Sequence, residues 1–204
     1  MKRGKILEAK TTQDKILATA VELLAKNHFA NVSMGDIAKA CNLTKPSIYY
    51  HFNSKKGLYL ELARRMLKQI RAELAEITDT DLSLRETLLL IVRMRFESLR
   101  KKPDLVRAHF AFIFNRDIRD LIESLQDDIM ALQQAIVPKF TQAIENGEIE
   151  SGTDPVLISI MFHSTLNTYL LRVLHGCSRF EELPEPERFV DIIFNGISIR
   201  GEDK

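Results

Sequence analysis

A short stretch near the N-terminus carries side chains suited to contact nucleic acid. On the outer surface of one short helix we expect two adjacent tyrosines, a histidine, a lysine and a hydroxyl: Lys45, Ser47, Tyr49, Tyr50 and His51. Their hydroxyl, imidazole and ammonium groups suit phosphate oxygens and the edges of bases. The alternative is a small pair of core helices with an aromatic packing edge.

Two short helices joined by a tight turn must position these side chains. Ser33 is the expected N-cap of the first helix, with Asp36 three residues later in the capping-box relation. Asn42 tolerates the left-handed backbone conformation that a tight turn needs. Thr44 is the expected N-cap of the second helix, and Pro46 stands in its first turn, where a missing N–H costs no intrahelical bond. This spacing predicts a helix-turn-helix.

Basic residues extend this pattern beyond the two helices. Lys55 and Lys56 open the next helix, where they oppose the helix dipole, so we expect an ammonium and the backbone N–H groups to hold an anion together. The 204 residues carry a net charge of +1, yet residues 1–60 hold ten Lys/Arg against four Asp/Glu. A basic N-terminal part on a slightly acidic body indicates a nucleic-acid-binding module joined to something else. For the basic residues 1–10 themselves, a frayed terminus is favoured over an arm that touches DNA.

The run IAKACNLTKPSIYYHFNSKKGLYLEL at residues 37–62 resembles the signature of the TetR family of bacterial transcriptional regulators. The resemblance covers about residues 16–62. It implies an all-α fold, and we predict a helix-turn-helix DNA-binding domain at residues 1–57 and a helical effector-binding and dimerisation domain at residues 58–204.

Family roles can be carried onto the matching positions of this sequence. The resemblance implies phosphate contacts for His51 and Lys55. It implies contacts near bases or the sugar-phosphate backbone for Lys45, Pro46, Ser47, Tyr49 and Tyr50. The predicted function is a homodimeric, ligand-responsive transcriptional regulator, a repressor, that binds a palindromic operator in double-stranded DNA. The full set of predicted DNA-binding residues is Ser33, Thr44, Lys45, Pro46, Ser47, Tyr49, Tyr50, His51 and Lys55.

The rest of the chain shows helical periodicity and no strand pattern. One long helix, about 116–146, is expected to kink at Pro138, because proline removes an N–H and crowds the previous turn, and to end at Gly147. The last two helices, from about 155 to 175 and after the linker 181–187, are apolar around much of their circumference. They are either core helices or a subunit interface, and the resemblance favours dimerisation through them.

Arg95 falls on an apolar stripe, seven residues after Leu88 and three after Val92. An internal ion pair or a snorkelling side chain often explains such an arginine, and the alternative is an anchor for an anionic ligand. We predict a mainly apolar pocket between the helix from Ser54 and the helices of residues 84–146, for a hydrophobic or aromatic small molecule. The candidate ligand-binding residues are Met66, Arg95, Phe96, His109, Phe110, Phe114, His163 and Asn167.

The sequence offers little support for other classes of function. The five histidines show no motif spacing and no nucleophile has a recognisable base, so we predict no catalytic residue, metal or cofactor. The two cysteines form no Cys-x-x-Cys pair, which fits a cytoplasmic protein. The most apolar run, 156–162, is far below the roughly 20 residues of a membrane span. The competing hypotheses are a DNA-binding protein without small-molecule control and an all-helical enzyme with an incidental helix pair.

Overall fold

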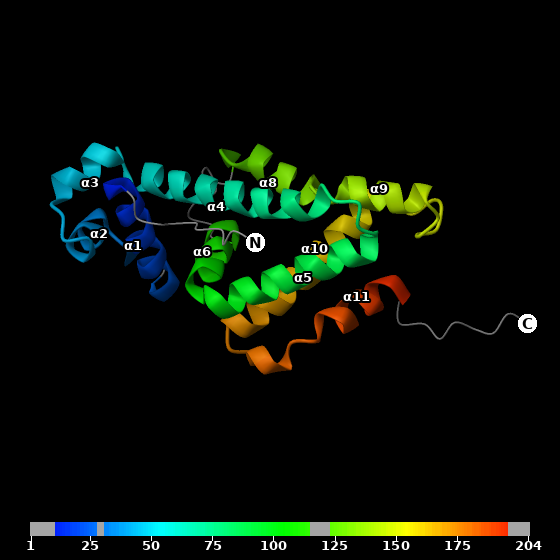
Figure 1. Ribbon diagram of the computed structural model, residues 1–204. Coiled ribbons are helices and arrows are strands. Elements are labelled where there is room, and N and C mark those ends of the chain that lie inside the picture. Colours follow the sequence, from blue (N-terminus) through cyan, green and yellow to red (C-terminus); the bar gives the residue numbers. More distant parts are fainter. Residues whose placement is uncertain (1–10, 28–30, 115–122, 196–204) are drawn as a thin grey trace, which may run out of the picture. The chain divides into compact units, whose positions relative to one another are not determined.

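The computed structural model describes residues 11–27, 31–114 and 123–195 (Figure 1). Within these ranges the chain is helical and has no strand, which confirms the all-α class. A 3-10 turn, Phe180–Glu182, precedes the last helix. The helices are α1 (Thr12–Lys26), α2 (Met34–Ala40), α3 (Lys45–His51), α4 (Lys55–Thr78), α5 (Leu84–Lys101), α6 (Pro103–Phe114), α8 (Gln126–Gln134), α9 (Val137–Glu145), α10 (Pro155–Leu174) and α11 (Pro186–Asn195).

The chain forms two compact units. Unit 1 comprises Met1–Glu73 and Lys101–Leu132, and unit 2 comprises Leu74–Arg100 and Gln133–Lys204. Helix α4 therefore contributes residues to both units. The predicted domain boundary between residues 57 and 58 stays a prediction.

The core of unit 1 joins the first four helices to α6 and α8. Helix α1 packs against both α2 and α6. Its Ile16 and Leu17 are fully buried, as are Ile37 of α2, Ile48 of α3 and Leu58 of α4. Because every helix of the predicted helix-turn-helix supplies a buried side chain to one core, the outer face of α3 is held by packing on its inner face.

Unit 2 contains α5, α9, α10 and α11. Helix α9 packs against α10. Two ion pairs join α5 to α11, Arg85 with Asp191 and Arg93 with Glu187. The two pairs run in opposite chain directions, so α5 and α11 lie antiparallel.

An aromatic cluster fills the contact between three helices of unit 2. The ring of Phe189 on α11 meets three other rings edge-on, with centroid distances of 6.4 Å to Phe96, 6.2 Å to Phe162 and 5.6 Å to Tyr169. Edge-to-face geometry at these distances is favourable for aromatic pairs. The cluster therefore fixes α11 against α5 and α10.

Lys139 of α9 is buried. In the contacts described for it, its ammonium binds backbone carbonyls and not a carboxylate. Its Nζ donates hydrogen bonds to the carbonyl oxygens of Thr80 and Leu82, the second at 3.2 Å. Both carbonyls lie in the loop between α4 and α5. The lysine thus satisfies acceptors of this loop and ties it to α9.

The expected helix 116–146 is wrong as a single element. Within its described part, α8 ends at Gln134 and α9 begins at Val137, with a turn between them. Pro138 lies in the first turn of α9, where its missing N–H costs nothing, so it starts a helix instead of kinking one. Gly147 ends α9 as predicted: its φ is 74°, and the N–H of Glu148 donates to the carbonyl of Ala143 at 2.8 Å.

Helix α10 leaves a row of large apolar side chains uncovered. Val156, Leu157, Ile160 and Met161 are between 43% and 58% exposed. By length and composition alone, α10 would be able to cross a membrane. The alternative cover for such a row is a second protein surface.

Candidate nucleic-acid interface

The first helix of the pair, α2, begins with the predicted capping box. The Ser33 backbone N–H and hydroxyl donate to the Asp36 carboxylate at 2.8 and 2.6 Å, and the Asp36 N–H donates to Ser33 Oγ at 3.1 Å. The hydrogen bonds from Ser33 lower the pKa of the Asp36 carboxyl. Ser33 is therefore engaged in holding the start of α2, although its side chain is exposed.

The turn between α2 and α3 depends on Asn42, as predicted. Its φ is 53°, and it is the only residue other than glycine with positive φ in the described ranges. The N–H of Asn42 donates to the carbonyl of Lys39 at 3.1 Å, and the N–H of Leu43 donates to that of Ala38 at 2.9 Å. This pair of bonds is the Schellman arrangement that closes a helix before a sharp change of direction.

Helix α3 begins at its predicted cap. The Ser47 N–H donates to Thr44 Oγ1 at 3.3 Å, the two hydroxyls lie 2.9 Å apart, and Pro46 occupies the first turn. Ile48 and Phe52 are buried beneath the helix. The cap and these two anchors determine which face of α3 points outward.

That outward face carries most of the predicted contact residues. Tyr50 is 86% exposed and Tyr49 is 43% exposed, and Lys45 is exposed beside them. His51 is half-buried, and its ring lies edge-on to that of Tyr50 with centroids 5.3 Å apart. An exposed tyrosine pair next to a lysine offers hydroxyl and ammonium donors in one small area. Thr44 and Ser47 belong to the cap, and of the two Thr44 is exposed and Ser47 half-buried.

Lys55 lies at the start of α4 and is half-buried. Burial lowers the pKa of its ammonium, and the nearby charge of Asp36 acts in the opposite direction. Ser54 caps the same turn, because its Oγ accepts the N–H of Gly57 at 2.9 Å. A cation and the N-terminal N–H groups of α4 therefore face the same region, as an anion requires.

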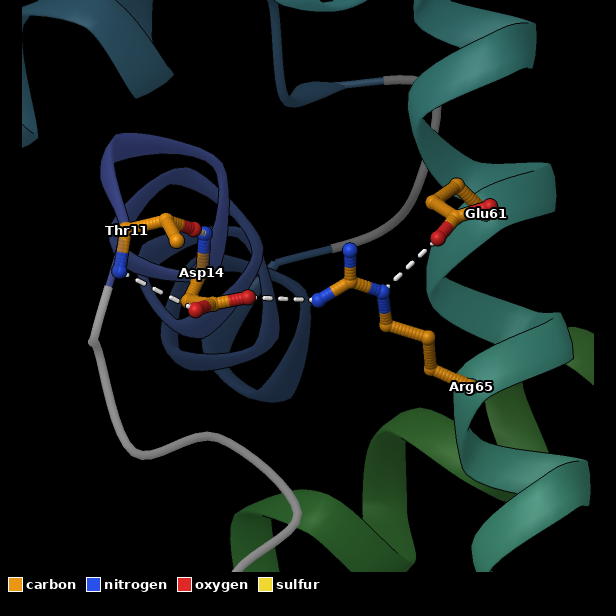
Figure 2. A network of polar contacts seen from close by, with 4 residues as sticks. All are labelled: Thr11, Asp14, Glu61 and Arg65. Atoms are coloured by element: carbon orange, nitrogen blue, oxygen red, sulfur yellow. Dashed lines mark hydrogen bonds and ion pairs between the residues drawn. The ribbon is translucent and has the colours of Figure 1, made fainter.

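A polar network attaches α4 to α1 (Figure 2). Arg65 on α4 donates from Nη1 to Asp14 at 2.6 Å and from Nε to Glu61 at 2.7 Å. Asp14 also closes the capping box of α1, since it accepts the Thr11 N–H at 3.1 Å. The hydrogen bond from Arg65 is the largest cause of a lowered pKa at Asp14. One arginine thus joins the N-terminal turn of α1 to the middle of α4.

The predicted ligand-binding residues fall into both units. Met66, His109 and Phe110 are buried in unit 1. In unit 2 the structure brings together Arg95, His163 and Asn167, while Phe96 belongs to the aromatic cluster. The side chain of Phe114 lies outside the described residues. The assignment of all these residues to a ligand site stays a prediction.

Sequence reasoning missed Arg65, Asp14 and Lys139 as positioning residues. Asp14 and Arg65 lie 51 positions apart, and Lys139 lies 57 positions from Leu82, so no local pattern joins them. Of the three, only Asp14 could have been recognised from local sequence, because it is the third residue of a helix whose N-cap is a threonine, as in a capping box.

Known proteins share this arrangement of helices. Residues 16–62 match the family model described as bacterial regulatory proteins, tetR family. Residues 16–62 are therefore similar to the helix-turn-helix region of TetR-family transcriptional regulators. The matched residues include α2, α3 and the first part of α4.

Individual relatives extend the likeness beyond the family model. The fatty acid metabolism regulator protein of Bacillus subtilis is 20% identical over 185 residues, 90% of this chain and 94% of that protein. The negative transcriptional regulator IcaR of the icaADBC biofilm operon of Staphylococcus aureus is 43% identical over 47 residues, 23% of this chain and 25% of IcaR. The structure of FadR from Bacillus subtilis in complex with stearoyl-CoA superimposes with a TM-score of 0.76 and 19% identity, over 90% of this chain and 98% of that one.

Proposed function

We propose that this protein is a ligand-responsive repressor that binds an inverted-repeat operator in double-stranded DNA as a homodimer. The observation that carries the proposal is the outward face of α3, where Lys45, Tyr49 and Tyr50 are exposed above a fixed core. Two such helices related by a two-fold axis would enter successive major grooves, about 34–36 Å apart. We expect the protein to act where the chromosome lies, in the cytoplasm.

The proposed contacts divide into two kinds. His51 and Lys55 contact phosphates, and Tyr50 contacts the sugar-phosphate backbone, so these residues supply affinity for any sequence. Lys45 reads the edge of a base, because it extends from the first turn of α3. Ser33, Thr44, Pro46, Ser47 and Tyr49 complete the surface.

Binding measurements on variants test this division. The operator is first found by selecting bound fragments from genomic DNA. Tyr50→Ala and Lys55→Ala should then weaken binding to all sequences, and Lys55→Ala should reduce the slope of log affinity against log salt by about one. Lys45→Ala should cost about 1–3 kcal/mol at one base position and leave the others unchanged.

Lys68→Ala is the matched control, because Lys68 is an exposed lysine farther along α4. It should leave both affinity and salt slope unchanged. If Lys45→Ala lowers every affinity by one common factor, its base-reading role is wrong. If wild-type protein binds random and selected DNA equally at every salt concentration, the protein is an unspecific DNA binder rather than a repressor.

Dimerisation is supported by the uncovered apolar row of α10. Val156, Leu157, Ile160 and Met161 repeat at helical spacing, and Ile192 of α11 is 41% exposed. A second copy that covers these side chains would remove them from water. Sedimentation should show a dimer for wild-type protein and a monomer for Ile160→Glu with Met161→Glu. Gln142→Glu, at an exposed polar position on α9, should remain dimeric.

The effector is proposed to be a hydrophobic or aromatic small molecule. Two observations support this: the similar FadR structure contains stearoyl-CoA, and Arg95 and Asn167 of unit 2 are hydrogen-bonded next to the aromatic cluster. If the effector weakens DNA binding by some factor, DNA must weaken effector binding by the same factor. Titration of effector with and without operator measures this. Equal affinities would show that the effector does not control DNA binding.

A further inference from the structure

Arg95 is a charged residue on the largely apolar, buried face of α5. It follows Leu88 by seven positions and Ile91 by four, so the three share one face of α5. Leu88 and Ile91 are 0% and 2% exposed, whereas Arg95 is half-buried. A guanidinium at this position loses hydration that a leucine or methionine would not lose.

Two polar side chains of α10 lie against this guanidinium. Arg95 Nη2 donates to Asn167 Oδ1 at 3.4 Å, and Asn167 follows His163 by four residues on the same face of α10. Arg95 is also close enough to His163 to act on it electrostatically. A cation, an amide and an imidazole thus converge between α5 and α10.

The imidazole of His163 carries a buried polar atom that the described protein leaves without a hydrogen bond. Its Nδ1 is the atom concerned. Burial, and to a lesser extent the charge of Arg95, lower the pKa of His163 to about 4, so the ring is neutral at pH 7. Buried polar atoms are rarely left unpaired, and those that are usually have a water, an ion or a ligand as partner.

Packing alone does not account for this group of residues. An apolar trio would fill the same space without desolvating a charge and without an unpaired nitrogen. Residues that weaken a core in this way are concentrated at functional sites. The aromatic cluster adjoins the group, since Phe96 and Phe162 are the chain neighbours of Arg95 and His163.

We infer that Arg95, His163 and Asn167 form a binding site for the anionic oxygen group of a largely apolar effector. Arg95 supplies the charge, Asn167 orients the guanidinium, and His163 offers its unpaired nitrogen. This inference rests on the proposed ligand-responsive function and names the chemistry of its effector. The anion can come from a free carboxylic acid or from the phosphates of a coenzyme A thioester. The titration described next distinguishes these two sources.

Calorimetric titration of the full-length protein with three probes of equal chain length tests the site. The probes are dodecanoate, 1-dodecanol and dodecanoyl-coenzyme A, each kept below its micelle concentration. Wild-type protein should bind at least one of the two anions about tenfold or more tightly than the alcohol. Arg95→Met, which keeps an unbranched side chain without its charge, should remove that preference and leave alcohol binding within about twofold.

Arg93→Met is the matched control, because Arg93 lies on the same helix and pairs with Glu187 at the surface. It should keep the wild-type preference. Circular dichroism reports whether Arg95→Met folds. If Arg95→Met does not fold, Asn167→Leu is tested in its place. This variant removes the hydrogen bond to the Arg95 guanidinium and should reduce the preference for the anion. If the preference that Arg95→Met removes is for dodecanoate, the anion is a carboxylate, and if it is for dodecanoyl-coenzyme A, the anion is a phosphate.

Two results would overturn the site. The first is a wild-type protein that binds the alcohol as tightly as both anions, or that binds none of the three. The second is an Arg95→Met variant that keeps the preference. The proposed function is judged separately, by DNA release: a neutral effector that releases operator equally from wild type and Arg95→Met would remove the anion site and leave the ligand-responsive repressor intact.

Discussion

Mild acid should destabilise the fold through His163. In the folded protein burial lowers the pKa of this imidazole from 6.5 to about 4, with a smaller contribution from Arg95. Between these two values the unfolded chain binds a proton that the folded chain does not bind. Stability therefore rises with pH across this window and is lost as the pH falls from about 6.5 towards about 4.

The size of the effect follows from the two pKa values. Their difference of about 2.5 corresponds to about 3 kcal/mol when the window is crossed completely. Between about pH 7.5 and about pH 5, the part that His163 contributes is about 2 kcal/mol. This is a large share of the free energy of unfolding of an ordinary domain, which is about 5–15 kcal/mol.

Urea unfolding, followed by circular dichroism at both pH values, measures this contribution. The wild type is compared with His163→Gln, which is neutral throughout, at one fixed protein concentration because a dimer would make stability concentration-dependent. The variant should lose about 2 kcal/mol less than the wild type on acidification. His175→Gln, which replaces an exposed imidazole at the end of α10, is the control and should behave as the wild type. Equal losses in the wild type and His163→Gln would refute a buried neutral imidazole.

Other contacts predict further measurable changes. Lys139→Met should lower the free energy of unfolding by about 2–4 kcal/mol, because two loop carbonyls lose their donor, whereas the exposed Lys68→Met should change it by less than about 0.5 kcal/mol. Asn42→Val should cost about 1–2 kcal/mol, since a β-branched residue resists positive φ, while Asn42→Gly should remain within about 0.5 kcal/mol of wild type. Arg65→Met should raise the pKa of the Asp14 carboxyl towards its ordinary value, which an NMR titration of the carboxyl carbon measures, because the hydrogen bond from Arg65 is the largest cause of its lowering.

The helix-turn-helix could be predicted closely because its signals are local. Ser33 and Thr44 cap the helices that follow them, and Asn42 takes the positive φ that the turn requires. Each depends on residues within three or four positions, so the sequence alone determines it. Gly147 at the end of α9 is a further case.

Features made by contacts between distant residues could not be predicted in the same way. Pro138 is compatible with a kink inside one helix or with the first turn of a new one, and only the surrounding packing selects the second. The position of Arg95 on an apolar face was readable from spacing. Its contact with Asn167 was not, because the two lie 72 positions apart.

Helix α4 is the element on which the proposed regulation depends. Its first turn carries Lys55, its middle carries Arg65, and from Leu74 on it contributes to unit 2. The Asp14–Arg65 ion pair and the buried Leu62 attach α1 and the helix pair to α4, so under the proposed regulation a displacement of α4 would carry these helices with it. An effector that acts in this way would have no need to reach the outward face of α3. A difference of about 2.7 kcal/mol in its affinity for two positions of α4 is enough to change the affinity for DNA about a hundredfold.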